Sequence, residues 1–353
     1  MSISIQERYF SLNRILLLTV GLWPYQQSKF VSCQAALCLG ILTSFVILLI
    51  QYLLEQFQYI YNRLKDSKEI AIYNKYGNIG KRITISITVV GICNHAYLAV
   101  IQCGPYILDM IMPKNETYSR RFILVMSNYF AVQEKYFYLF LLHLNAVFAV
   151  GSLALIAVAT MLLSCLKHIC GMMKIASYRF EQAILTMLQS ITLKNKTMTY
   201  KEFICAVDIH RKAMEIAKIF VDDMERSLFI VTMSTVLCMS LNLYALSQGE
   251  SPVQEIERTI GHLLLIIFLF TYMFIANYAG QEITDSNNHI FLTVYNASWY
   301  LAPLQIQKLI LFLLQRSNKA FTLNLGGLFT LSIECFASLI NASVSYFTLM
   351  LSL

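Results

Sequence analysis

Residues 30–54 form an apolar run of 25 positions without a single charged side chain. About 20 residues of α-helix cross the 30 Å hydrocarbon core of a bilayer, so this run is long enough to span a membrane. Hydrophobic residues make up 57% of the chain, charged residues 13%, and the mean hydropathy is +0.59. Soluble domains carry about 25% charged residues. We therefore predict an all-α, polytopic membrane protein.

Six apolar runs are long enough to cross the membrane as helices, and polar stretches separate them. A weaker seventh candidate, residues 290–314, carries polar or helix-breaking residues at depths where polar groups are costly. These residues are Asn296, Pro303, Gln305, Gln307 and Lys308. We expect this segment to be an amphipathic helix packed on protein at the membrane edge. The expected spans are residues 30–54, 83–108, 136–166, 227–246, 259–279 and 320–353, and the expected polar segments are 1–29, 55–82, 109–135, 167–226, 247–258 and 280–319.

The distribution of basic residues predicts the orientation of the chain. Of its 27 Lys and Arg residues, 22 fall in segments 1–29, 55–82, 167–226 and 280–319, which we expect to be cytoplasmic. The C-terminus is then extracellular, as is the glycosylation sequon at Asn115. By this count, the segments before and after the first span are both cytoplasmic. A helix that crosses the membrane once has its two ends on opposite sides. Either the N-terminus is outside or one span is absent.

The longest polar stretch, residues 167–226, keeps a helical spacing of apolar side chains. This spacing is clearest over residues 181–193 and 201–225. We expect helices here that extend the neighbouring spans into the cytosol. No proline-rich or glycine-rich linker divides the chain, which indicates one helical domain without an added module.

Signals for catalysis, metal binding and nucleic-acid binding are missing from the sequence. It contains no H-E-x-x-H, P-loop or G-x-S-x-G motif, so we expect no enzyme activity and no cofactor. Seven of the nine cysteines lie in apolar runs, which fits neither a disulfide framework nor a metal site. The basic residues are scattered between apolar runs, so we expect no nucleic-acid partner.

Aromatic and polar side chains gather near the outer ends of two expected spans. An apolar cavity with a few polar groups among them would suit a small volatile or lipid-like ligand. An interfacial aromatic belt and ordinary helix packing are alternative explanations that the spacing leaves open. His95 lies beside this set. The candidate pocket residues are Asn94, Tyr97, Ile101, Tyr136, Phe140, His143, Leu144 and Val147.

The last expected span carries more polar side chains than a lipid-facing helix tolerates. Ser338, Asn341, Ser345 and Leu349 are spaced three or four apart and share one helix face. Repeated around a symmetry axis, this face would line a pore, with Leu349 and Leu353 as an outer constriction. Packing on neighbouring helices through small residues is an equally good explanation.

Several segments together resemble the insect odorant receptors, specifically the tuning subunits abundant in ants, bees and wasps. The similarity extends over nearly the whole chain and is strongest in its last third. The segments that carry it are Ser11-Leu-Asn-Arg14, Gly21-Leu-Trp-Pro24, residues 64–77, Gln133-Glu-Lys-Tyr136, His168-Ile-Cys-Gly171, Ala176-Ser-Tyr-Arg179, residues 295–303, Gln307-Lys308, Gln315-Arg316 and Ser345-Tyr-Phe-Thr348.

The resemblance implies a helical bundle of seven spans with a cytoplasmic N-terminus and an external C-terminus. It also implies an odorant-gated, non-selective cation channel in the plasma membrane of olfactory sensory neurons. The expected partners are a small apolar odorant, membrane lipid and the co-receptor Orco, in a hetero-tetramer. By this resemblance the pocket lies around Tyr97 and His143. The pore end would comprise Ser345, Tyr346, Leu349 and Leu353, and the assembly anchor Trp299, Tyr300, Pro303, Lys308, Gln315 and Arg316.

One departure from the family pattern matches the problem in the charge count. Family members have a second span between the first one and the segment that begins near residue 54, and no apolar run provides it here. A truncated, non-functional receptor is therefore one alternative. A metabotropic, G-protein-coupled chemoreceptor is another, although D-R-Y and N-P-x-x-Y motifs are missing from the sequence. A transporter should show two related halves, which are not visible.

Overall fold

The computed structural model describes residues 29–64, 66–111, 137–189, 193–248, 255–317 and 322–352. The chain divides into two compact units, residues 1–64 and 65–353. The described part of the first unit is one helix, α3 (Lys29–Arg63). Side-chain bonds one turn apart support α3, from Gln51 to Glu55 and from Gln58 to Asn62.

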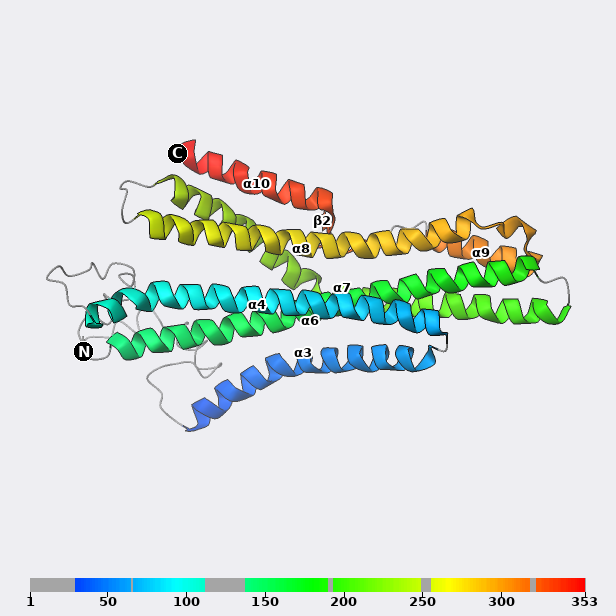
Figure 1. The fold of residues 1–353 in the computed structure, drawn as a ribbon, viewed down its shortest axis with the longest axis horizontal. Coiled ribbons are helices and arrows are strands. Elements are labelled where there is room, and N and C mark those ends of the chain that lie inside the picture. The colour runs from blue at the N-terminus through cyan, green and yellow to red at the C-terminus, as the bar shows by residue number, and fades with distance from the viewer. Residues whose placement is uncertain are drawn as a thin grey trace, which may run out of the picture. The chain divides into compact units, whose positions relative to one another are not determined.

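Long helices that run side by side make up most of the second unit (Figure 1). They exceed the length of a membrane span because their polar segments are helical too. Residues 167–226 extend the neighbouring spans, as expected, whereas residues 67–82, expected as a loop, also belong to a helix. These helices are α4 (Ser67–Ile111), α6 (Phe137–Gln189), α7 (Leu193–Ser247) and α8 (Glu255–Asn296).

Four segments of the described residues are long and apolar enough to cross a membrane. Each one overlaps an expected span. They are Leu142–Met187, Glu225–Ser247, Thr259–Asn296 and Ile333–Ser352.

The expected amphipathic helix over residues 290–314 is two helices. The first, α8, ends at Asn296, a short turn η3 (Trp299–Leu301) follows, and α9 (Leu304–Ser317) then packs against α8 (Figure 1). Pro303 explains the break, because a proline disfavours helical geometry in the residue before it but is accepted where a helix begins. The amphipathic part is α9, which buries Ile306, Ile310 and Leu313.

The last expected span, residues 320–353, also differs from the structure. A small antiparallel hairpin, β1 (Asn324–Leu325) and β2 (Phe329–Thr330), precedes a shorter helix, α10 (Ile333–Ser352). Gly326 and Gly327 turn the chain with positive φ angles of 60° and 68°. Only glycine adopts this backbone geometry without strain, so the Gly-Gly pair fixes the turn.

Helices α4 and α6 lie antiparallel and approach closely. A side chain on Gly91 would collide with Ile156, and a Cβ on Gly171 would lie 3.1 Å from the Cβ of Tyr76.

The polar halves of α6, α7 and α8 contain most of the large, fully buried side chains of the second unit. We call residues 166–189, 201–224 and 280–296 the packed half, and residues 142–165, 225–247 and 259–279 the apolar half. Fully buried side chains in the packed half include Ile169, Met172, Met173, Ile175, Phe180, Phe203, Ile283 and Ile290.

Candidate functional site

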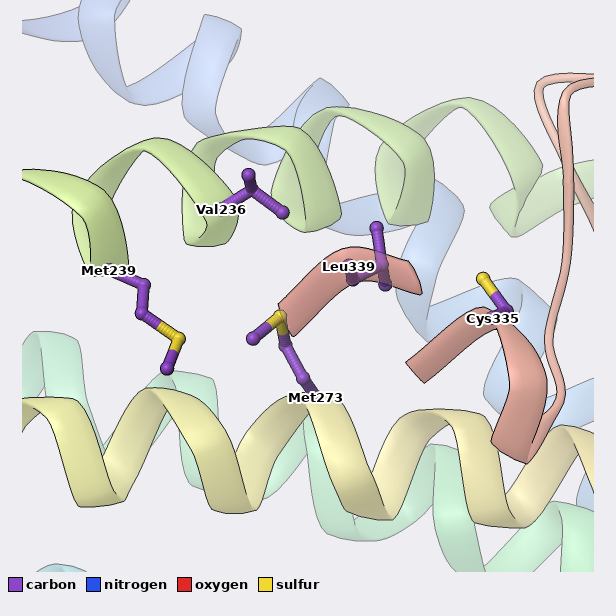
Figure 2. Close-up of a cluster of buried hydrophobic side chains, with 5 residues drawn as sticks. All are labelled: Val236, Met239, Met273, Cys335 and Leu339. Atoms are coloured by element: carbon purple, nitrogen blue, oxygen red, sulfur yellow. The ribbon is translucent and has the colours of Figure 1, made fainter. Parts of the chain in front are cut away.

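One face of α10 packs on α7 and α8. Cys335, Leu339 and Ser343 are buried and follow one another at intervals of four residues. Figure 2 shows Cys335 and Leu339 beside Val236 and Met239 of α7 and Met273 of α8, in one hydrophobic cluster. A hydrogen bond adds to this contact, because the Ser240 hydroxyl donates to the carbonyl oxygen of Ser343 at 2.9 Å.

The opposite face of α10 is polar and exposed. The hydroxyl of Ser338 donates to the carbonyl oxygen of Glu334, and the hydroxyl of Ser345 donates to that of Asn341, at 3.0 and 2.8 Å. Each hydroxyl thereby has a hydrogen-bond partner within the helix, and its side chain remains exposed to solvent. We call this face the polar stripe. It consists of Glu334, Ser338, Asn341, Ser345, Thr348 and Ser352.

Three predicted pore-end residues lie in α10 and are exposed. Ser345 belongs to the polar stripe, and Tyr346 and Leu349 are 50% and 56% exposed. The fourth, Leu353, falls outside the described residues. The part of the site that the sequence did not reveal is the buried face of α10, because Cys335 and Ser343 stand among similar small residues.

The predicted pocket residues lie on the paired helices α4 and α6, toward the ends away from the packed half. Asn94 and Tyr97 are half-buried on α4, and on α6 Leu144 is half-buried while His143 and Val147 are exposed. Since Gly91 meets Ile156, continuing the antiparallel pairing brings both sets to the same end of the helix pair. The side chains of Ile101, Tyr136 and Phe140 fall outside the described residues, as does Asn115.

The predicted anchor residues lie on the turn from α8 into α9 and along α9, with Gln315 and Arg316 in the last turn of α9. Trp299 and Pro303 are half-buried, and Tyr300, Lys308, Gln315 and Arg316 are exposed. Gln307, which was not among the predicted anchor residues, stabilises the turn: its side-chain amide donates to the carbonyl oxygens of Tyr300 and Ala302, at 2.9 and 2.8 Å.

An intramembrane polar pair also escaped the sequence analysis. Nδ1 of His262 on α8 lies 2.8 Å from Oδ1 of Asn242 on α7, within two expected spans. The Asn242 amide also donates to the carbonyl oxygen of Cys238 at 2.7 Å. A histidine inside an apolar run was the available signal, because polar residues at such depth generally have a partner.

Charged and polar bonds join the helices of the packed half. The Arg179 guanidinium of α6 binds both carboxylate oxygens of Glu69 on α4, at 2.6 and 2.8 Å, and contacts the Cys205 carbonyl oxygen on α7. Tyr178 donates to Asp66 at 2.9 Å. Lys167 pairs with Glu282 of α8.

One histidine is buried within this packed half. His210 of α7 is 4% exposed and its Nε2 lies 3.4 Å from Oδ1 of Asn287 on α8. Burial lowers the pKa of His210, which favours the neutral imidazole. Within the described ranges, no group of three His, Cys, Asp or Glu side chains is placed to hold a metal ion. The described residues thus offer two helix surfaces that carry polar groups: the polar stripe of α10, and the end of the α4–α6 pair with Asn94, Tyr97 and His143.

Comparison with known proteins gives a consistent result. The family model described as 7tm Odorant receptor matches residues 26–344. Odorant receptor 30a of Drosophila melanogaster is 26% identical over 131 residues, which cover 37% of this chain and 35% of that one. Odorant receptor 10 of Aedes albopictus is 22% identical over 195 residues, 51% of each chain. The odorant receptor coreceptor of Harpegnathos saltator is 22% identical over 147 residues, 42% of this chain and 30% of that one.

These matches span between about a third and half of the relatives' length. Among solved structures, the insect olfactory receptor OR5 from Machilis hrabei covers 98% of both chains with a TM-score of 0.60 and 14% identity. The same receptor in complex with eugenol gives a TM-score of 0.54 and 12% identity, again over 98% of both chains. At these identities the likeness shows the fold.

Proposed function

The chain belongs to the insect odorant receptor family, and we propose that it is the odorant-binding subunit of a ligand-gated, non-selective cation channel. The observation that carries this proposal is the exposed polar stripe of α10. The helix is long and apolar enough to cross a membrane, yet six polar side chains follow one another along the face that its own bundle leaves open.

A stripe of this kind is unfavourable against lipid and favourable against water. A single helix does not enclose water, so the stripe calls for several copies of α10 around an axis, as in a symmetric oligomer. The hydroxyl and amide groups would then line a wide aqueous path, which fits weak selectivity among cations. Leu349 and Leu353, near the end of α10, are the proposed hydrophobic constriction.

Assembly is supported by a second exposed surface, on the turn and on α9. Large apolar side chains there lie outside the segments able to span a membrane, and soluble surfaces rarely leave such patches open. We propose that another subunit covers them, the co-receptor Orco in a hetero-tetramer. The side chains are Tyr300, Leu301, Leu304, Leu311 and Phe312, between 52% and 69% exposed.

The odorant site is proposed at the end of the α4–α6 pair that carries Asn94, Tyr97 and His143. Aliphatic and aromatic side chains supply burial for a small apolar molecule, and these three groups supply one or two hydrogen bonds for orientation. Eugenol, bound by a receptor of the same fold, is a ligand of this size and polarity class. The ligand acts by binding the open arrangement of α10 more tightly than the closed one.

The proposed location is the plasma membrane of olfactory sensory neurons, and the test uses the subunit co-expressed with Orco in oocytes. Ser345→Cys places a thiol on the polar stripe, and Ser343→Cys places the same thiol on the buried face two residues away. A permanently cationic methanethiosulfonate is then applied during recording of the cation current. Wild type gives the background from its exposed native cysteines.

If α10 lines the pore, the reagent reduces the current of Ser345→Cys severalfold and leaves Ser343→Cys and wild type unchanged. Equal insensitivity of both variants, with both present at the cell surface, contradicts the pore assignment. A current that requires G-protein activation would favour the metabotropic alternative.

A further inference from the structure

The hairpin between α9 and α10 is held in place by side chains from two other helices. Because it is the covalent connection into α10, whatever fixes the hairpin also fixes the first turn of that helix. Three residues provide the contacts, and we call them the clasp: Glu225 of α7, with Asn277 and Gly280 of α8.

Asn277 supplies an acceptor with a fixed direction. Its Oδ1 accepts the backbone N–H of Ser332 at 3.3 Å, while its Nδ2 donates to the Met273 carbonyl oxygen at 2.9 Å. The side chain is 1% exposed, so water does not replace either bond. Ser332 in turn caps α10, because its hydroxyl accepts the N–H of Cys335 at 3.0 Å.

Gly280 lets the hairpin lie directly on the backbone of α8. A Cβ at this position would collide with the side chain of Leu331 and lie 2.9 Å from its carbonyl oxygen. The colliding oxygen belongs to the backbone, so rotation of a side chain does not relieve the contact. Leu331 is 6% exposed and also donates its N–H to Leu323 across the hairpin at 2.9 Å.

Glu225 holds the tip of the hairpin from the other side. Its Oε1 accepts the N–H of Gly327 at 3.1 Å. Beside it, the ring of Phe229 on α7 fills the space where a side chain on Gly326 would lie, 2.9 Å from a built Cβ. The hairpin is therefore held between α7 and α8 at both its tip and its base.

The far end of α10 is arranged differently. After Ser343, most side chains are exposed, including Val344, Tyr346, Leu349 and Leu351 at 43% to 56%. The cluster that supports the first half of the helix contains Met239 and Met273, whose unbranched side chains repack readily. One end of α10 is thus fixed by directional bonds and a backbone contact, and the other is open.

We propose that the clasp is the positioning device of the channel helix: it holds the first turn of α10 on α7 and α8 and so sets the balance between closed and open arrangements. This inference rests on the proposed function, because it assumes that α10 lines the pore. Glu225, Asn277 and Gly280 act through the hairpin and do not touch ligand or permeating ions.

The test compares two glycines of the same helix. Gly280→Ala pushes the hairpin off α8, whereas Gly261→Ala adds the same methyl group where nothing lies within 4 Å. Both are placed in the Ser345→Cys subunit and co-expressed with Orco in oocytes. The readouts are the current without odorant per subunit at the cell surface and the rate of modification by the cationic methanethiosulfonate.

Gly280→Ala is expected to change both readouts by at least about fivefold relative to Gly261→Ala, the population change produced by a bias of roughly one kcal/mol. Because Gly280→Ala could misfold, a second pair of variants tests the clasp with a smaller change at Glu225. Glu225→Ala removes the acceptor for Gly327, whereas Glu225→Gln keeps a side-chain oxygen there. The alanine variant should shift both readouts in the same direction as Gly280→Ala, and glutamine should restore them.

The two possible failures are distinguishable. If Ser345→Cys is unreactive in every background, the pore assignment fails and the clasp loses its role. If Ser345→Cys reacts and blocks current, but Gly280→Ala equals Gly261→Ala and the two Glu225 variants equal each other, the pore assignment stands and the clasp proposal is overturned.

Discussion

The two halves of α6 are continuous in sequence but differ in what surrounds them. In the apolar half, Leu155 is 74% exposed and Val150 70%, whereas in the packed half Ile169 and Phe180 are completely buried. Apolar side chains occupy both halves, so hydrophobicity alone does not separate them. The difference teaches that the packed half holds the fold together, while the apolar half leaves surface for lipid, ligand and other subunits.

The largest expected effect compares one apolar truncation in each half. Phe180→Ala removes a buried ring that meets Phe203 at 5.1 Å between centroids, and should cost about 3 to 5 kcal/mol. Leu155→Ala removes an exposed side chain and should change the free energy of unfolding by less than about 0.5 kcal/mol. Melting temperatures of the detergent-purified complex check this. Similar losses from both variants would mean that the apolar half is packed as tightly.

The next comparison concerns two arginines of the packed half, one in a buried ion pair and one in an exposed ion pair. Arg179→Ala leaves the Glu69 carboxylate buried without its guanidinium partner, and should destabilise the protein by about 3 kcal/mol or more. The matched control, Arg211→Ala, breaks an exposed pair with Asp208 and should cost at most about 1 kcal/mol. Surface yield and melting temperature measure both. If Arg179→Ala destabilises the protein no more than Arg211→Ala does, the bidentate bond contributes little to the packing of α4 on α6.

Acidification should weaken the packed half. Burial lowers the pKa of His210, so the unfolded chain binds a proton that the folded chain does not. The stabilisation is therefore present above the ordinary histidine pKa of about 6.5 and is lost as pH falls through it.

The pH effect is measured as the difference in melting temperature between pH 8 and pH 5.5. His210→Gln should reduce this difference, and a difference that stays the same would assign the effect to other groups.

The smallest expected effect lies in the apolar half. Asn242→Leu removes the hydrogen bond to His262, and interhelical bonds in membranes contribute on average about 0.6 kcal/mol. A double-mutant cycle with His262→Phe should give a coupling of that size. A coupling well above it would mark this pair as a tightly enclosed polar site instead of an ordinary interhelical bond.

Periodic features of the fold could be predicted from the sequence. Apolar runs predicted six spans, and four of these overlap described helices that are long and apolar enough to cross a membrane. The helical spacing of residues 167–226 predicted that α6 and α7 continue beyond the apolar runs. The hairpin at residues 324–330 was missed although Gly326-Gly327 signals a turn, because its flanking residues are apolar enough to read as part of a span. For the same reason Pro303 was placed inside one helix instead of at the start of α9.

Contacts between distant residues could not be predicted. The bonds between Arg179 and Glu69 and between Asn277 and Ser332 join residues 110 and 55 positions apart, and no local pattern indicates which partner each side chain will meet. The polar stripe was partly visible, since Ser338, Asn341 and Ser345 share a face by spacing. Which face of α10 is buried depends on α7 and α8, so only the structure separates the stripe from Cys335, Leu339 and Ser343.

A cysteine scan along α10 in the complex with Orco tests the central claim most directly. Each position from 334 to 352 except the native Cys335 is replaced in turn by cysteine, and its rate of reaction with a cationic, water-soluble methanethiosulfonate is measured. Fast reaction and block of current are predicted at positions 334, 338, 341, 345, 348 and 352, with slow reaction at 339 and 343. Rates that follow no helical period, or that peak on the buried face, would contradict a pore lined by the polar stripe.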